Sequence, residues 1–521
     1  MKLSLLLRSV SLAVIILAPA ILPSADAASA TWLTAPVSGD WNTAGNWTAG
    51  GPPNGPADTA TFASSSIGGV SISANTEVNG IMFNANASPF RITANPTFTL
   101  TISGAGITNT SGVTQNFVAD FDSSVGAIVF TNSAAAGSLT VFSNAGGFTH
   151  FMDSSTAGSA TINNNAGIGA TEFFDSASAS DGTFINHGGG NGKGGGLTRF
   201  WNNSTAVNGV FTTDGGVGRD GSGGSVSFND TSTAANATLI ANGGKEGGHG
   251  AEIALSSEST GGTARVQVFG NGRLDISNRL PTSEGVTIGS IEGTGKVFLG
   301  AFNLTVGSNN LSTIFSGVIK DGGSGQGSGG SLTKIGTGKL TLGNASTYTG
   351  GTTINNGTLL VRNRTKSATG NGSVQVNIGT LGGTGIINGS VTIGVGDSAG
   401  AILLPGNSVT KPGTLTVNSV VTFNSFSTYE CVLNRSTFVT GQVIAAGVTI
   451  NSDVAFTFVD TGTGTLTVGT VFTGIDNTST DPIVGAFSNL IDGAVITSNG
   501  NNFQANYKGG DGNDLTLTVV P

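Results

Sequence analysis

The chain of 521 residues contains few of the side chains from which catalytic and metal sites are usually built. It has one cysteine, three histidines and only 9% charged residues. A single cysteine excludes an internal disulfide, and neither a His-x-x-x-His pair nor a cysteine pattern typical of a metal site is present. Cys431 lies in an apolar-alternating stretch, where we expect a buried structural thiol.

Positive charge is also scarce, because the net charge is −9. Proteins that bind nucleic acid display clustered Lys and Arg, so the composition argues against a nucleic-acid partner. The densest basic run is Arg362–Lys366 (RNRTK), which is short and is expected to be a solvated loop.

Long hydrophobic runs are missing as well. No stretch reaches the roughly 18 apolar residues that a transmembrane helix requires. At the N-terminus, Lys2 and Arg8 precede the apolar stretch Leu12–Leu17, and a small-residue cleavage site ends at Ala27. This pattern predicts a secretory signal peptide over residues 1–27, with the mature chain extracellular or at the cell surface.

Glycine, in contrast, is abundant, with 85 residues. No Gly-X-Y period is present, so collagen is excluded. A hydrophobic content of 37% and a slightly positive mean hydropathy argue against disorder. Thr, Ser, Asn, Gly and Val suit narrow coils with tight corners, and the composition therefore predicts an all-β protein.

The most informative segment is Ser331–Val361, which reads SLTKIGTGKLTLGNASTYTGGTTINNGTLLV. Apolar side chains occupy every second position at Leu340 and Leu342, and again at Leu359 and Val361. Alternation with period two predicts strands with one buried face, and Asn-Gly supplies a tight turn. A unit of three short strands buries its apolar face only when it stacks on further units.

At these residues the chain resembles the autotransporter-associated β-strand repeat, also called the passenger-associated transport repeat. That repeat occurs in secreted passenger domains of bacterial autotransporters. The resemblance implies a right-handed parallel β-helix that works outside the cell. Family members with a translocator continue into a barrel, whereas this sequence stops at Pro521, and we expect no barrel of its own.

A looser repeat runs from Thr131 to Gly272. Each copy has an aromatic or apolar residue, then Asn or Asp with Ser/Thr and Ala, then an apolar strand and a glycine-rich turn. Its spacing of 21 to 27 residues matches one coil per copy, and we expect the recurring aromatics to stack inside. The residues chosen as markers are Thr131, Met152, Phe174, Trp201, Phe228 and Leu255.

These observations predict four parts. Residues 1–27 form the signal peptide, 28–107 N-terminal capping strands, 108–400 the β-helix with repeats at 131–272 and 331–361, and 401–521 a β-rich cap. Trp32, Trp41 and Trp47 are expected to cover the first coil; a carbohydrate-binding aromatic platform is the alternative. The last part resembles the closing domain of the same family, read as broader antiparallel strands.

Carboxylates recur at one repeat position, at Asp153, Asp175 and Asp230. Glycoside cleavage needs paired carboxylates, and these three could line one side of the helix. The matching positions hold Asn132 and Asn202, so Asn and Asp interchange, which is typical of turn residues bonded to their own backbone. We therefore expect neither catalytic residues nor a bound cofactor. His187 and His249 are expected in exposed loops.

Calcium is the one metal that the sequence suggests. Gly509–Leu517 (GGDGNDLTL) matches part of the nonapeptide GGxGxDxUx, with Asp511 and Asp514 as candidate ligands. Only one copy is present, and Thr516 replaces the large apolar residue, so a turn closing the last hairpin is favoured over a calcium site.

The leading hypothesis is therefore a secreted or cell-surface structural β-helix of adhesin type, monomeric and non-catalytic. It would bind a surface glycan or protein through repeated loops. The alternative is a polysaccharide-active β-helix enzyme, either a lyase or a glycoside hydrolase, whose carboxylates cannot be assembled from the sequence alone.

Overall fold

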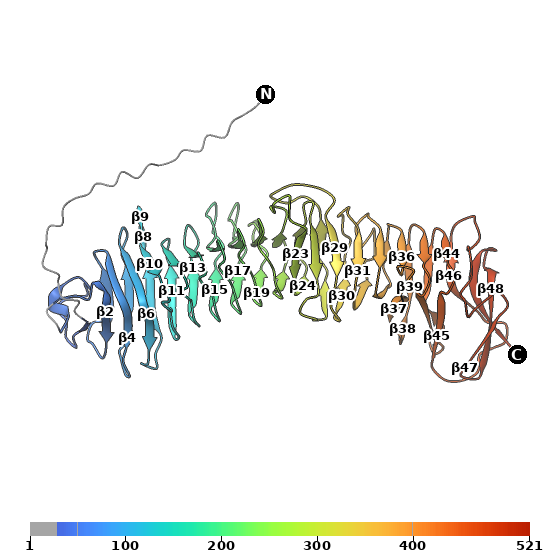
Figure 1. Cartoon of the computed structure of the whole chain (residues 1–521), viewed down its shortest axis with the longest axis horizontal. Helices are drawn as coiled ribbons and strands as arrows, with labels where there is room; N and C mark the ends of the chain where they lie inside the picture. Colours follow the sequence, from blue (N-terminus) through green and yellow to red (C-terminus); the bar gives the residue numbers. More distant parts are fainter. Residues whose placement is uncertain (1–28, 49–50, 399) are drawn as a thin grey trace, which may run out of the picture.

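The computed structural model describes residues 29–48, 51–398 and 400–521, which form one elongated parallel β-solenoid of about 16 turns (Figure 1). The chain winds from the blue N-terminal coils at one end to the red C-terminal strands at the other. Among the described residues there is one 3-10 turn, Ala44–Asn46, and no α-helix. The expected signal peptide, 1–27, lies outside the described residues.

One side of the solenoid is a 13-stranded parallel sheet, here the first sheet. Its strands, in spatial order, are β1 (Ala30–Thr31), β2 (Gly55–Phe62), β4 (Thr76–Phe83), β6 (Thr99–Asn109), β10 (Ala127–Phe130), β12 (Phe148–Phe151), β14 (Ala170–Phe173), β16 (Leu197–Phe200), β18 (Ser225–Phe228), β20 (Glu252–Leu255), β22 (Arg273–Asp275), β25 (Lys296–Phe298) and β28 (Val318–Lys320). A small ribbon, β8 (Phe121–Asp122) with β9 (Ser124–Val125), lies between β7 and β10 in the chain.

The second sheet runs along nearly the whole solenoid, with one parallel strand per coil. Its strands are β3 (Gly69–Ile72), β5 (Arg91–Ala94), β7 (Gln115–Ala119), β11 (Thr140–Asn144), β13 (Thr161–Asn164), β15 (Thr183–Asn186), β17 (Val210–Thr213), β19 (Thr238–Ala241), β21 (Arg265–Val268), β24 (Ser290–Gly293), β27 (Thr313–Phe315), β30 (Lys339–Leu342), β32 (Thr358–Val361), β34 (Gly379–Gly383), β37 (Ala401–Ser408), β41 (Thr428–Asn434) and β45 (Ala455–Thr461). β37 and β41 turn back as antiparallel hairpins with β38 (Lys411–Pro412) and β42 (Val439–Thr440).

The third side changes along the molecule. In the N-terminal half it consists of single β-bridges, such as Thr156↔Ser178 and Ser178↔Thr205. From residue 285 it becomes the third sheet, whose strands are β23 (Gly285–Ile288), β26 (Asn303–Val306), β29 (Ser331–Lys334), β31 (Thr352–Ile354), β33 (Val374–Val376), β36 (Val391–Ile393), β40 (Val421–Phe423) and β44 (Val448–Ile450).

A fourth sheet extends the side of the first sheet toward the C-terminus. Irregular turns join the two, because Thr347 N–H donates to Ile319 O at 2.9 Å, and Ala368 N–H donates to Ile386 O at 3.0 Å. The strands of the fourth sheet are β35 (Ile386–Ile387), β39 (Thr414–Val417), β43 (Gln442–Ala445), β46 (Val471–Asn477), β49 (Asp514–Val520), β48 (Asn501–Gly509) and β47 (Val495–Ser498).

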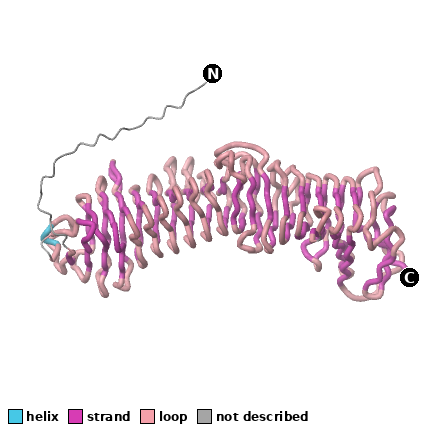
Figure 2. Tube along the Cα trace, in the orientation of Figure 1, coloured by secondary structure: helices cyan, strands magenta, loops and turns pink. Residues whose placement is uncertain are grey.

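Strands of successive coils lie directly on one another, as the tube trace shows (Figure 2). In most four-residue strands the second and fourth side chains are buried and the others half-buried or exposed, which is the predicted period-two pattern. Leu340, Leu342, Leu359 and Val361 are all buried, so this interpretation of the strongest segment is confirmed.

A column of stacked phenylalanine rings runs through the interior of the solenoid, in the coils from β10 to β18. The ring centroids of successive members lie 4.8, 4.8, 4.6 and 4.7 Å apart, with interplanar angles of at most 9°. The members are Phe130, Phe151, Phe173, Phe200 and Phe228. An internal aromatic ladder was predicted, and the structure contains one.

The markers chosen from the sequence were one residue out of register in the first four copies. Thr131, Met152, Phe174 and Trp201 directly follow the buried ring or its equivalent, and each is only half-buried. Strand side chains alternate between the two faces, so a shift of one residue moves a side chain from the core to the surface. Adjacent Phe-Phe and Phe-Trp pairs made the two registers look alike in the sequence.

An aromatic cluster closes the N-terminal end. Trp32, Trp41 and Trp47 pack around Phe62, with centroid distances of 4.9 to 6.0 Å, and all four side chains are buried. Trp41 Nε1–H donates to Pro53 O at 3.1 Å. Because the rings are buried, they act as a cap, and they do not form an exposed carbohydrate platform. Parallel coils already begin here, since β2, β4 and β6 belong to the first sheet.

The solenoid also continues beyond residue 400. β37, β41 and β45 pair in parallel, as do β39 and β43, although the 401–521 segment was expected to be antiparallel. Antiparallel pairing is found in the two side hairpins and in the last layer, β46–β49–β48–β47. The strands β37, β41 and β45 extend beyond one side of a coil. Their length is the reason why residues 401–521 look different from the preceding repeats in the sequence.

We expect Phe173→Ala to lower the free energy of unfolding by about 3–5 kcal/mol, because it removes a fully buried ring from the column. The matched control is Phe174→Ala, which truncates the neighbouring half-buried ring and should cost about 1 kcal/mol or less. Denaturant unfolding of the full chain measures both. Equal losses would contradict the register described here.

Candidate functional site

The recurring carboxylates form a column at one exposed corner of the coils. Asn132, Asp153, Asp175, Asn202 and Asp230 all have a left-handed backbone, with φ between 52° and 57°. Each main-chain N–H donates to the side-chain oxygen of the next member, at 2.8, 3.1, 3.0 and 2.9 Å in chain order. The turn role expected for these residues is therefore observed, but each side chain bonds the backbone of the preceding coil rather than its own.

This arrangement explains why Asn and Asp interchange at the corner. Both supply an acceptor oxygen, and both tolerate the left-handed conformation better than other residues with a Cβ atom. One oxygen of each of Asp153, Asp175 and Asp230 is thereby engaged in joining coils. The column works as a structural fastening along the corner.

A second polar column lies inside the solenoid and was missed in the sequence. Asn144, Asn164 and Asn186 are fully buried, and the amide Nδ2 of each of the first two donates to the Oδ1 of the next, at 2.6 and 2.7 Å. Threonine hydroxyls complete the column. They are Thr149, Thr171 and Thr198, donating at 2.7 to 2.8 Å. The available signal was Asn at the end of three equivalent strands, FSN, INN and FIN.

The histidines lie apart from one another. His150 Nε2 lies 3.3 Å from Glu172 on the outer face of the first sheet, and Arg199 Nη1 lies 2.9 Å from the same carboxylate. The contacts with His150 and Arg199 hold the pKa of Glu172 below its usual value, although burial acts in the opposite direction. These three groups form a row across three coils, with the carboxylate between the imidazole and the guanidinium.

His187 and His249 were expected in exposed loops, and they do not share a site. His187 Nδ1 lies 3.6 Å from Asp214 Oδ2, and Asn242 donates to the other oxygen of Asp214 at 3.2 Å. His249 lies in a later glycine-rich loop, where its carbonyl accepts from Gly216 N–H at 2.8 Å. The glycine-rich loops of neighbouring coils thus stack on one another.

The segment with the calcium candidates forms the turn between β48 and β49, where Gly509 pairs with Asp514. Asp511 is exposed at the tip, whereas Asp514 is buried and accepts from Asn477 N–H at 2.9 Å. Burial raises the pKa of Asp514 above its usual value. In residues 29–48, 51–398 and 400–521, no group of three or more His, Cys, Asp or Glu is placed to hold a metal ion. The expected turn closing the last hairpin is thus present, and calcium binding by Asp511 and Asp514 stays the less favoured hypothesis.

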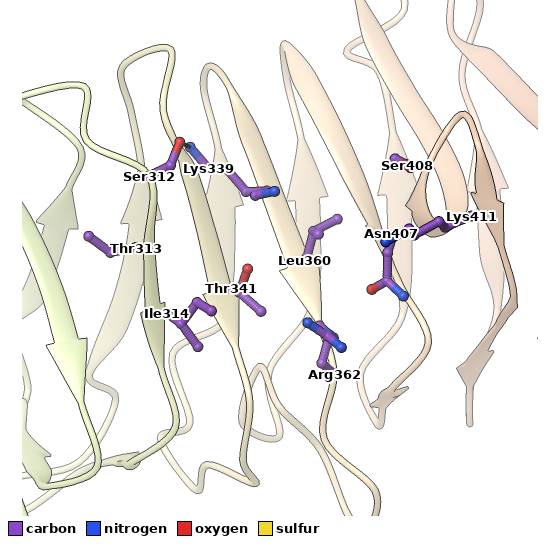
Figure 3. Close-up of a pocket in the computed structure, with 10 residues that line it drawn as sticks. All are labelled: Ser312, Thr313, Ile314, Lys339, Thr341, Leu360, Arg362, Asn407, Ser408 and Lys411. Carbon is purple, nitrogen blue, oxygen red and sulfur yellow. Dashed lines mark hydrogen bonds between the residues drawn. The ribbon is translucent and has the colours of Figure 1, made fainter.

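Three cationic side chains line a hollow of about 460 Å³ on the outer face of the second sheet (Figure 3). Its floor comes from β27, β30 and β32, and the β37–β38 hairpin forms one wall. Lys339, Arg362 and Lys411 line it, and all three are exposed. Asn407 also lines it, and its Oδ1 is buried with no hydrogen-bond partner among the described residues.

Residues 332–361, which supply part of this floor, match the family of the passenger-associated transport repeat. Residues 332–361 are a passenger-associated transport repeat. The repeat contributes β30, β31 and β32 entirely and most of β29, and together with the solenoid it fits an autotransporter passenger. No curated protein matches the chain significantly. Within the described residues, no helix has the length and apolar character needed to cross a membrane.

The repeat buries one charged side chain, Lys334, whose exposed fraction is 1%. Its Nζ donates to the carbonyls of Ile335, Gly336 and Asn356, at 2.5, 2.9 and 3.4 Å. Burial lowers the pKa of Lys334 from 10.5 to about 8. The Lys334 ammonium therefore links the turns of two adjacent coils from inside the solenoid. This interior position leaves no room for a substrate.

We expect Asp175→Ala to lower the free energy of unfolding by about 2 kcal/mol. The change removes the acceptor for Asp153 N–H and places alanine at a φ of 52°. Asp175→Asn keeps both features, as Asn202 does one coil later, and should stay within about 0.5 kcal/mol of the parent chain. Guanidinium unfolding compares the two; a similar loss in both would show that the negative charge matters more than the acceptor.

The lysine of the repeat should make stability depend on pH. The folded chain releases the Lys334 proton near pH 8 and the unfolded chain near 10.5, so the unfolded chain binds more protons between these values. The free energy of unfolding of the parent chain, relative to Lys334→Met, should therefore rise by roughly 1–3 kcal/mol from pH 8 to 10.5. Lys339→Met, at an exposed position, is the control. A flat difference for Lys334→Met would contradict the lowered pKa.

Proposed function

We propose that this chain is an extracellular or cell-surface passenger with a structural and adhesive role and no catalytic activity. The observation that carries the proposal is the passenger-associated transport repeat within a continuous parallel solenoid. Repeats of this family occur in secreted autotransporter passengers, and a stiff, long solenoid suits the presentation of a binding surface far from its anchor.

The use of the acidic residues supports a non-catalytic role. The recurring Asp side chains at the coil corner accept hydrogen bonds from the neighbouring coil, and Glu172 lies between His150 and Arg199. A glycosidase instead needs two carboxyl groups facing each other across a substrate site. Side chains on the outer faces form rows along the coils. Such rows offer many equivalent contacts, which suits a surface that binds its partner at several points.

The test is to incubate the folded chain with neutral and acidic polysaccharides and to assay for new reducing ends and unsaturated products. We expect none above the level of a heat-denatured sample, together with retained binding to at least one glycan or cell-surface preparation. In parallel, protease added to intact producing cells should degrade the chain if it lies at their surface. Turnover that one Asp→Asn substitution abolishes would overturn the proposal and favour a polysaccharide-active enzyme.

A further inference from the structure

Charge is distributed unevenly along this acidic chain. Residues 322–429 contain six Lys or Arg and one carboxylate, Asp397, which gives this section a net charge of +5 in a chain of −9. Asp397 precedes β37 and so lies toward the strand ends where Lys339 begins β30, whereas Arg362 follows β32 and lies toward the opposite ends. One part of the solenoid therefore carries nearly unopposed positive charge.

Three of these cations converge on the hollow of Figure 3, although they come from three separate coils. Across the described residues, no carboxylate lies within 4.0 Å of a nitrogen of Lys339, Arg362 or Lys411. Several arginines elsewhere are paired, as Arg199 is with Glu172 and Arg273 is with Glu252. The cations at the hollow are thus available to an outside anion.

A second hollow of about 530 Å³ shares Arg362 and adds Arg364. The turn that carries both arginines is fixed from inside by Asn363, which is buried and donates to the carbonyls of Thr365 and Lys366 at 3.2 and 2.9 Å. Its Oδ1 accepts from Ile386 N–H at 2.9 Å. The basic run Arg362–Lys366, which was expected to be a solvated loop, therefore carries exposed charges. Its backbone is held in place by the hydrogen bonds of Asn363.

The other residues that line the two hollows favour one class of polyanion over another. Ile314 is 55% exposed on the floor, and Ser312 and Ser408 offer hydroxyls. A pyranose presents an apolar ring face together with hydroxyl donors, which fits this lining. Single-stranded nucleic acid needs aromatic platforms for its bases, and neither hollow is lined by an aromatic side chain.

We propose that the two hollows around Arg362 form one binding groove for a segment of an acidic polysaccharide whose uronate carboxylates pair with Lys339, Arg362, Arg364 and Lys411. Arginine offers a carboxylate two parallel N–H donors, and the exposed Ile314 offers an apolar contact to a sugar ring face. This inference rests on the proposed function and gives its adhesive role a ligand class.

The test measures binding of an oligogalacturonate to the full chain by calorimetry, at low and high salt. The triple variant Lys339→Gln, Arg362→Gln, Lys411→Gln should bind about tenfold more weakly or worse. The matched control is Lys193→Gln, Lys245→Gln, Lys508→Gln, which removes the same charge at exposed positions elsewhere and should bind within about twofold of the parent chain. The methyl-esterified oligomer, which lacks the carboxylate charge, should bind the parent chain about tenfold more weakly.

Ile314→Ser separates a glycan site from a general anion site, because it removes the exposed apolar side chain on the floor and keeps the cations. It should weaken oligogalacturonate binding severalfold and leave any binding of inorganic polyphosphate unchanged. The inference would be overturned if the parent chain and the triple variant of Lys339, Arg362 and Lys411 bound the oligogalacturonate equally well. It would also be overturned if this variant and the control triple variant lost the same affinity, or if polyphosphate bound at this groove as tightly as the uronate. Turnover of polysaccharide would instead overturn the proposed function, so the two failures are distinguishable.

Discussion

The structure depends on parallel strands that stack in register about 4.8 Å apart, one per coil. At this spacing each side chain lies against its counterpart in the next coil, so every position in the coil becomes a column along the molecule. Phe173 stacks on Phe200, Asn164 bonds Asn186, and Asp153 N–H bonds Asp175. The same closeness explains the glycine-rich loops, since a Cβ on Gly188 would lie 2.0 Å from Gly215 O.

Columns of identical neutral side chains are favourable, but columns of identical charges repel one another. The outer face of the first sheet avoids this repulsion by alternating sign between neighbouring coils, as in the pairs Glu172–Arg199 and Glu252–Arg273. Residues 322–429 do not alternate, because almost no carboxylate is present there. The unbalanced charge of this section destabilises the folded solenoid through repulsion between like charges, and the proposed acidic ligand would neutralise it on binding.

Both ends of such a stack would expose unpaired backbone groups and an apolar cross-section. The tryptophan cluster around Phe62 closes one end, and the antiparallel layer from β46 to β49 closes the other. Near the C-terminal end, Tyr429 and Phe487 stack with centroids 5.8 Å apart, and the Tyr429 hydroxyl donates to Gly474 O at 2.6 Å. Clusters of large aromatic side chains thus lie where a neighbouring coil is missing or where the chain changes direction.

The sequence by itself determined the fold class, the burial of residues such as Leu342 and Val361, and the turn role of the recurring Asn and Asp, because alternation and turn chemistry act between near neighbours in the chain. It did not determine which residue of Phe173-Phe174 points inward, the buried Asn144–Asn186 column, or the parallel pairing of β37, β41 and β45. Those depend on the register between coils. The groove around Arg362 was also decided only by the tertiary structure, since Lys339, Arg362 and Lys411 meet through stacking of coils whose turn lengths vary.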